Sequence, residues 1–362
     1  MVGPKRRVLR RGAGGVAGLL LLCLVVGTIY EAVGQRRDQE RLPRIGQAVD
    51  IGGRTLNISC SGAGSPAVIF DAGAGSPGYS WAGIQPQIAR FTRACWYDRA
   101  GEGWSEAGPF PRTSAAIARD LHELLVRARV PAPYVLAGHS FGGLTARVYT
   151  GLYPTEVAGL VLIEAAHEDE PLRAPPRFIG PKPPRLLWRP LHLLFMAAAR
   201  VGIIRLMTPK APLPTDPAQR TRDQIVEALR HRPLFIATTN SSGLLAPDSY
   251  AEARAAGGLG DRPLIVLTRG QPFGHDPDPI IERELSTYFQ VWVHDLQAQL
   301  ARLSTRGRQI IVENSGHGIP EEAPSEVAAA IRLVVEAARA PSTRTLPPND
   351  TLLEPHRSPQ PE

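Results

Sequence analysis

The sequence predicts an α/β fold with a mostly parallel eight-stranded sheet, helices on both faces and an inserted helical cap. Short runs of aliphatic and β-branched residues, bounded by Gly, Pro, Asp or Ser, recur along the chain. Stretches with helical periodicity, such as residues 113–128, lie between these runs. Apolar strands that alternate with helices are typical of a parallel sheet buried on both faces. The alternation stops between residues 168 and 261, and this interruption predicts the cap.

The expected strands begin with a hairpin. Residues 48–52 and 54–60 are two strand-like runs, and Gly52 and Gly53 supply the tight turn between them. We expect the sheet and its helices in residues 45–167 and 262–340. The six later runs, each bounded by turn-forming residues, lie at 66–73, 93–101, 134–140, 159–165, 263–270 and 308–316.

The interruption at residues 168–261 is rich in Pro at first and then helical in pattern, with no clear strand. Its most apolar part, residues 186–207, has the pattern of a helical segment. Enzymes with an α/β fold place their sites at the carboxyl edge of the sheet. We therefore expect this insertion to cover that edge as a helical cap.

The N-terminus predicts a membrane anchor. Residues 1–12 form a basic tail, and the eighteen residues 13–30 carry no charge. A helix of that length extends about 27 Å, close to the hydrocarbon thickness of a bilayer. We expect a transmembrane signal anchor over residues 13–34. A cleaved signal peptide is the alternative, since Ala32 and Gly34 would permit cleavage, but the apolar run is longer than the usual signal core.

The charge distribution bears on partners and on location. Residues 1–44 hold nine Lys or Arg and three Asp or Glu, so only a net charge of +1 remains for the rest of the chain. The body of the protein therefore gives no electrostatic case for a nucleic-acid partner. The basic leader favours a membrane-anchored protein whose main domain is extracytoplasmic, and residues 185–206 are expected to add apolar surface near the bilayer. The Pro-rich residues 341–362 predict a disordered tail.

The sequence Gly138-His139-Ser140-Phe141-Gly142 predicts a nucleophile. A strand-like run enters it and a helix-like run leaves it, as a G-x-S-x-G elbow requires. The glycines are needed because larger side chains beside the sharp turn would clash with neighbouring backbone. Ser140 is therefore the candidate nucleophile.

Five motifs in order make the chain resemble the α/β-hydrolase superfamily over residues 49–338, and in particular its membrane-anchored, actinobacterial-type serine esterase or lipase-like members. The resemblance implies an α/β-hydrolase fold and a serine hydrolase, with the cap outside the matching part. The motifs are FDAGAG, YDRAGEGWS, GHSFGG, VLIEAAH and NSGHG, each at the end of an expected strand.

The resemblance also implies roles for particular residues. His317 would be the general base, since an imidazole can take the Ser140 proton and return it to the leaving group. The acid that orients the base can follow either of two strands in this fold, and we prefer Glu164, which ends its strand, to Asp276, which lies further along a loop.

The oxyanion hole needs two backbone N–H groups. The resemblance assigns one to Phe141, directly after the nucleophile, and the other to Ala74 in the loop after the third strand. In that loop Ala72 and Gly73 stand where related proteins have His-Gly. The backbone donor is kept, but a usual support of the loop is lost.

The strand order that the resemblance implies places Cys60 beside Cys95, because the second strand runs antiparallel to its neighbour, the fourth. Adjacent strands lie about 4.8 Å apart, within the Cα separation that a disulfide accepts. A disulfide is therefore expected, with two buried free thiols as the alternative. A disulfide would fit an extracytoplasmic domain, since such bonds persist in oxidising surroundings.

These residues predict cleavage of a carboxylic ester, from a small molecule or a lipid, through an acyl-enzyme on Ser140. A serine favours acyl transfer, whereas related haloalkane dehalogenases and epoxide hydrolases use an Asp at the elbow. An acyltransferase or an amidase or peptidase with the same triad is the alternative, and a non-catalytic binding protein is a second. No cofactor and no metal are expected, because the sequence has no zinc-spaced Cys/His cluster and no Walker A loop.

Overall fold

The computed structural model describes residues 4–179, 183–243 and 246–340. Its centre is one eight-stranded sheet in the order β1-β2-β4-β3-β5-β6-β7-β8. β2 is antiparallel to both of its neighbours, and the other strands pair in parallel. This confirms the predicted fold class and all eight predicted strands. The strands are β1 (Gln47–Asp50), β2 (Thr55–Ser61), β3 (Ala67–Asp71), β4 (Ala94–Tyr97), β5 (Tyr134–His139), β6 (Val157–Ile163), β7 (Leu264–Arg269) and β8 (Gly307–Val312).

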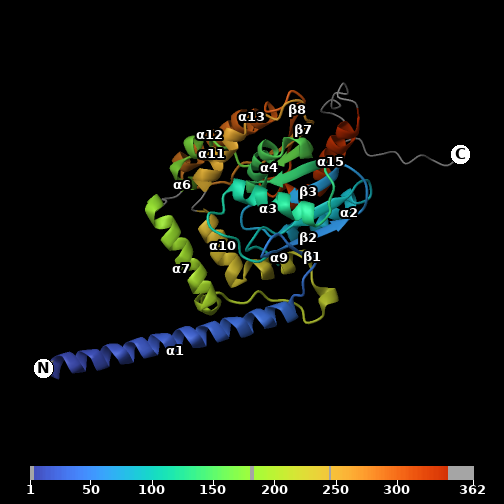
Figure 1. The fold of residues 1–362 in the computed structure, drawn as a ribbon. Coiled ribbons are helices and arrows are strands. Elements are labelled where there is room, and N and C mark those ends of the chain that lie inside the picture. The colour runs from blue at the N-terminus through green and yellow to red at the C-terminus, as the bar shows by residue number, and fades with distance from the viewer. Residues whose placement is uncertain (1–3, 180–182, 244–245, 341–362) are drawn as a thin grey trace.

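Helices cover both faces of the sheet, as Figure 1 shows. Successive residues of the central strands point to opposite faces, because side chains in a strand alternate. In β3, Ile69 contributes to one core, and Val68 and Phe70 contribute to the other. Helices α3 (Ser114–Arg127), α4 (Phe141–Leu152) and α13 (Ala298–Ala301) pack on the first face, and α2 (Gln85–Ile88) and α15 (Pro324–Arg339) pack on the second.

The segment between β6 and β7 consists of helices joined by loops in the part that the structure describes, and we call residues 168–261 the cap segment. Its longest apolar part does not form one helix, in contrast to the expectation for residues 186–207. Gly202 has a φ of +74°, a left-handed conformation that ends α7 before α8 begins. The segment contains α5 (Glu170–Arg173), α6 (Pro176–Ile179), α7 (Trp188–Arg200), α8 (Ile203–Met207), α9 (Arg222–Arg230), α10 (Pro233–Gly243) and α11 (Ala246–Ala256).

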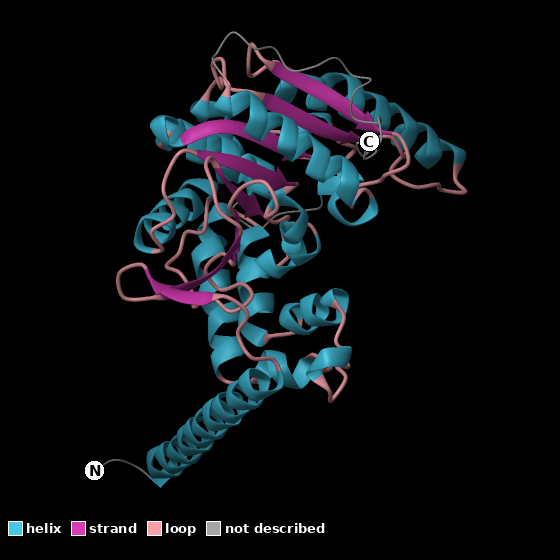
Figure 2. Cartoon of the chain, turned by 90° about the vertical axis from the view of Figure 1, so that its right-hand side faces the viewer, coloured by secondary structure: helices cyan, strands magenta, loops and turns pink. Residues whose placement is uncertain are grey.

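Helix α1 (Pro4–Arg41) projects from the domain (Figures 1 and 2). It continues past the expected end of the anchor at residue 34. By length and composition alone, its part Gly14–Arg41 could cross a membrane, with a mean hydropathy of 2.2 over the apolar window. The predicted disordered tail, residues 341–362, lies outside the described residues.

Cys60 and Cys95 are directly opposite each other on β2 and β4. Their sulfur atoms are bonded at 2.03 Å. The link joins the antiparallel β2 to the parallel part of the sheet. Two further segments complete the chain after β7: α12 (Pro279–Gln290) with the π-helical turn η5 (Val291–Gln297), and the short α14 (Ile319–Glu322) after β8.

Candidate active site

Ser140 occupies a sharp turn between β5 and α4. Its φ of 51° is unusual for a residue with a side chain and stores strain in the turn. The flanking glycines are required: a Cβ on Gly138 would lie 2.5 Å from the Gly142 carbonyl oxygen, and one on Gly142 would lie 2.3 Å from the Asp71 carbonyl oxygen. The turn therefore presents the Ser140 side chain at the carboxyl end of the sheet.

Glu164 directly follows β6 and is fully buried. It too has a positive φ, 45°. Its Oε2 accepts a hydrogen bond of 2.9 Å from the Arg269 backbone N–H, and its Oε1 accepts one of 2.9 Å from Trp292 Nε1. The His317 Nδ1 lies 3.7 Å from Oε1. The carboxylate is thus fixed by two donors and faces the imidazole of His317.

His317 lies in the loop after β8, with about half of its side chain exposed. Its backbone carbonyl accepts a hydrogen bond of 2.8 Å from His139 Nε2, which links this loop to the serine turn. Burial lowers the pKa of His139 to about 4, so this ring is neutral near pH 7 and carries its proton on Nε2. His139 therefore positions His317 through its backbone.

Asp276, the other candidate acid, is turned toward its own loop. Its Oδ1 accepts a hydrogen bond of 2.9 Å from the Asp278 backbone N–H, and its own N–H donates to Glu282 Oε2 at 2.8 Å. These contacts stabilise the start of α12. Of the two candidate acids, Glu164 is the one whose carboxylate faces His317.

The two residues assigned to the oxyanion hole flank the serine. Phe141 is the first residue of α4, where backbone N–H groups have no partner within the helix and the helix dipole is positive. Ala74 lines the same cavity as Ser140. Gly73 permits this close approach, since a Cβ there would lie 3.0 Å from His139 Nδ1 and 3.4 Å from Ser140 Cβ.

Arg99 supports the loop after β3 that contains Ala74. It is almost fully buried, and it donates hydrogen bonds to the backbone carbonyls of Ala72 and Gly73. The Asp71 carboxylate, 2.5 Å from Arg99 Nη2, balances its charge. The guanidinium also lies 5.3 Å from the ring centre of Phe141. Arg99 thus fixes the backbone of the loop that carries Ala74.

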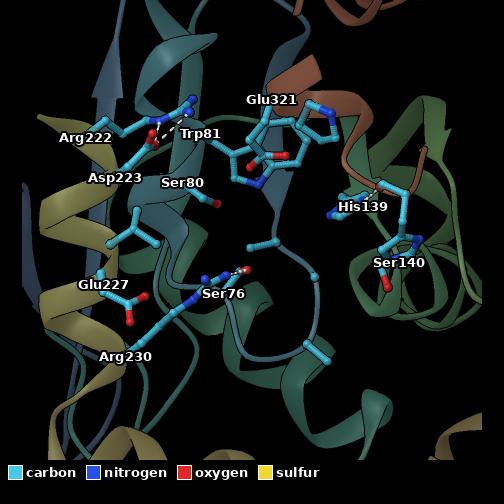
Figure 3. Close-up of a pocket in the computed structure, with 16 residues that line it drawn as sticks. Ser76, Ser80, Trp81, His139, Ser140, Arg222, Asp223, Glu227, Arg230 and Glu321 are labelled. Carbon is cyan, nitrogen blue, oxygen red and sulfur yellow. Dashed lines mark hydrogen bonds and ion pairs between the residues drawn. The ribbon is translucent and has the colours of Figure 1, made fainter. Parts of the chain in front are cut away.

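A cavity of about 420 Å³ lies over Ser140 and is shared with His317. Figure 3 shows the serine turn on one side and the charged helix α9 on the other. Arg230 donates to the Gly75 carbonyl at 2.9 Å and to Ser76 Oγ at 2.7 Å, so α9 is tied to the oxyanion loop. The cavity wall also carries Arg222, Asp223, Glu227 and Glu321.

Sequence reasoning missed three of these supports. Arg99 lies inside the YDRAGEGWS motif, which was the available signal for it. Trp292 reaches Glu164 from the π-helical turn η5, an irregularity that sequence periodicity does not reveal. Arg230 lies in the cap segment, outside the motifs that carry the resemblance. Within the described ranges, no three His, Cys, Asp or Glu side chains are grouped to hold a metal ion.

Comparison with known proteins shows which family the chain belongs to. The chain is 26% identical over 151 residues to the uncharacterized protein YbdG of Bacillus subtilis, which covers 41% of this chain and 46% of that protein. The chain spans less than half the length of the first curated relatives that it matches.

Two solved structures share the fold. An esterase from Thermogutta terrifontis aligns with a TM-score of 0.55 and 19% identity, over 82% of this chain and all of that one. An epoxide hydrolase from Vigna radiata aligns with a TM-score of 0.57 and 17% identity, over 81% of this chain and 98% of that one. The alpha/beta hydrolase family matches residues 68–330, which is most of the chain. The protein therefore belongs to the alpha/beta hydrolase family.

Proposed function

We propose that the protein is a serine hydrolase that cleaves a carboxylic ester through an acyl-enzyme on Ser140. The observation that carries the proposal is the grouping of three side chains at one edge of the sheet. Ser140 and His317 line one cavity, and the buried Glu164 carboxylate lies 3.7 Å from His317 Nδ1. This is the arrangement of nucleophile, base and orienting acid that acyl transfer needs.

In the proposed reaction, Ser140 Oγ attacks the ester carbonyl while His317 Nε2 takes its proton. The buried carboxylate of Glu164 stabilises the imidazolium that forms. The oxyanion of the tetrahedral intermediate is stabilised by the backbone N–H groups of Phe141 and Ala74. His317 then protonates the departing alcohol. A water molecule attacks the acyl group, and His317 again takes and returns the proton.

The identity of the nucleophile supports acyl chemistry. One structural neighbour is an epoxide hydrolase, and in that chemistry a carboxylate at the elbow attacks carbon. The elbow here carries a serine, which forms an acyl ester with the substrate. The charged cavity wall favours small esters with polar groups over long acyl chains, because burial of alkyl surface against charged side chains gains little.

The test is hydrolysis of a nitrophenyl ester series by the purified full chain. Ser140→Ala and His317→Ala should each lower kcat by about 10⁴-fold or more, because triad residues act as a unit. Ser80→Ala is the matched control, since Ser80 also lines the cavity and should retain activity. Wild-type turnover by Ser140→Ala would refute the proposal. Within the series, the nitrophenyl acetate should be hydrolysed in preference to nitrophenyl esters with long acyl chains.

We further propose that residues 13–30 anchor the enzyme in a membrane with the catalytic domain on the extracytoplasmic side. The exposed apolar surface of α1 supports the anchor, and the Cys60–Cys95 bond supports an oxidising compartment. Alkylation of native membranes without reductant, followed by peptide mass spectrometry, should find Cys60 and Cys95 protected. Free, alkylated thiols at both positions would contradict this location.

A further inference from the structure

Exposed apolar side chains gather on two helices of the cap segment. In α7, Leu193 and Leu194 are 58% and 62% exposed, and in α8, Leu206 and Met207 are 73% and 79% exposed. Single exposed apolar residues are common on soluble proteins, but a group of this kind marks an interaction surface. We call these four residues the cap apolar face.

The chain around this face is basic. Residues 171–215 contain eight Lys or Arg and no Asp or Glu. Several of these cations form ion pairs with other segments, such as Arg173 with Asp295. Arg189, Arg200 and Lys210 are exposed and form no ion pair with any residue that the structure describes. An apolar face bordered by unpaired cations is typical of a surface that binds anionic lipid.

Helix α1 is packed against the same part of the cap segment. Gly27 is in such close contact that a Cβ there would lie 2.4 Å from the Val201 carbonyl oxygen. Arg205 in α8 lies 2.8 Å from the Glu31 carboxylate and 2.7 Å from that of Asp38. The Arg205 and Glu31 side chains are almost fully buried. The end of α1 is therefore fixed to α8.

This contact sets where a membrane would lie. The apolar part of α1 extends beyond α7 toward the N-terminus, and α7 runs steeply across the direction of α1 (Figure 1). A helix that crosses a bilayer along α1 would therefore carry α7 close to the bilayer surface. The contact between Gly27 and Val201 lies at the end of the uncharged run 13–30, where the hydrocarbon would end.

We infer that the cap apolar face lies in the headgroup layer of the bilayer that α1 enters, with anionic lipid headgroups paired to Arg189, Arg200 and Lys210. The inference rests on the proposed membrane anchor and is independent of the proposed ester hydrolysis. Helix α1 and the cap apolar face then both hold the cap segment at the membrane. The catalytic cavity therefore keeps a fixed orientation to the lipid surface. A second copy of the chain or a polypeptide partner on this face are the alternatives that the experiment separates.

The experiment places a fluorescent thiol probe on the full chain in nanodiscs that hold one copy each. The discs contain equimolar phosphatidylglycerol and phosphatidylcholine, with nitroxide groups on a fraction of the lipids. Leu194→Cys and Met207→Cys are labelled in a Cys23→Ala background. Val126→Cys on α3 is the matched control, since Val126 is 56% exposed. Cys23 of the unaltered chain reports on α1 itself.

Blue-shifted emission and loss of fluorescence to the lipid nitroxides are expected at positions 194 and 207 and at Cys23, with neither at position 126. Quenching at Cys23 but not at 194 and 207 would overturn the inference and leave the anchor intact. No quenching at any position would overturn both. Discs with one copy exclude a second chain as the cause of a blue shift. Ester hydrolysis by the labelled chains, measured in parallel, reports on the proposed function separately.

A second experiment tests the contribution of the three cations. Reversal of all three unpaired cations, with Arg189→Glu, Arg200→Glu and Lys210→Glu, should weaken quenching at position 194 and leave quenching at Cys23 unchanged. The control reverses three exposed arginines of the core, Arg90→Glu, Arg119→Glu and Arg302→Glu, and should leave both unchanged. Equal quenching at position 194 in the two triple variants would contradict the assigned lipid contact.

Discussion

The core and the cap segment are held in place by different interactions. The proposed catalytic residues stand at the ends of strands, where Ser140 and Glu164 have positive φ and the surrounding backbone is paired. Exposed ion pairs join the helices of the cap segment to the rest of the domain, such as Arg173 with Asp295 and Arg177 with Glu284. Exposed ion pairs contribute little to stability. The comparison indicates a rigid catalytic edge beneath a segment whose attachment is easier to change.

The largest effect is expected from the buried acid. In Glu164→Gln, an amide replaces the carboxylate that faces His317 and accepts from Trp292. Loss of the charge and of the correct tautomer of the base should lower kcat by about 10⁴-fold. Asp276→Asn, on the exposed loop, should change kcat little. Steady-state hydrolysis of one nitrophenyl ester compares them, and a crippled Asp276→Asn with an active Glu164→Gln would reverse the assignment.

Arg99 tests whether the core fixes the oxyanion loop. Arg99→Met leaves the buried Asp71 carboxylate without its partner and should reduce the free energy of unfolding by about 3–5 kcal/mol. The double variant Arg99→Met/Asp71→Asn should recover much of that stability. It should not recover kcat, because the carbonyls of Ala72 and Gly73 remain unsupported. Recovery of both quantities would show that Arg99 acts on stability alone.

The pKa of His139 predicts a pH dependence of the stability of the folded protein. Its pKa is lowered to about 4 in the folded protein, whereas an imidazole in the unfolded chain has a pKa near 6.5. Between these values the unfolded state binds more protons, so stability should fall as pH drops from about 6.5 to 4, by on the order of 3 kcal/mol.

The measurement is chemical unfolding across that pH range, with His139→Gln as the reference. Burial raises the pKa of Asp98 to about 6 and that of Glu102 to about 7, and these groups titrate in the same window with the opposite sign. Because both proteins contain them, the difference between wild type and variant isolates the ring. A difference that does not change with pH would contradict a His139 ring that is neutral in the folded protein.

The smallest effect belongs to the cap segment. Arg230→Ala removes two hydrogen bonds to neutral groups of the oxyanion loop, at Gly75 and Ser76. Each such bond contributes about 1 kcal/mol, so kcat/KM should fall by at most about 30-fold, the value expected if both bonds act fully on the transition state. Arg230→Lys, which keeps the charge, should retain part of the activity. A loss as large as that of Glu164→Gln would mean that α9 belongs to the catalytic machinery.

The strands and the serine turn could be predicted from the sequence, whereas the residues that support the site could not. Each strand was visible because an aliphatic run ends at a turn-forming residue, and GHSFGG located the serine turn because only small residues fit beside it. The supports of the site were not visible. Trp292 depends on a π-helical turn, which periodicity does not reveal. Arg99 lies in the YDRAGEGWS motif, but its bonds to the carbonyls of Ala72 and Gly73 depend on the tertiary fold.

The N-terminal helix shows the other limit. Its uncharged run predicted a possible membrane span from composition. Its continuation to Arg41 was not predicted, because Glu31 and Asp38 belong to a charged stretch that gave no sign of a partner in the cap segment. Long-range ion pairs of this kind depend on the tertiary fold, and sequence spacing carries no signal for them.

The most direct test of the central claim is the covalent chemistry of Ser140. Intact-protein mass spectrometry of the full chain after exposure to a fluorophosphonate should show one adduct per chain, and peptide mapping should place it on Ser140. Ser140→Ala should take up none, and Glu164→Gln should react far more slowly than wild type. An unmodified wild-type chain, or an adduct that persists in Ser140→Ala, would contradict a serine hydrolase at this site.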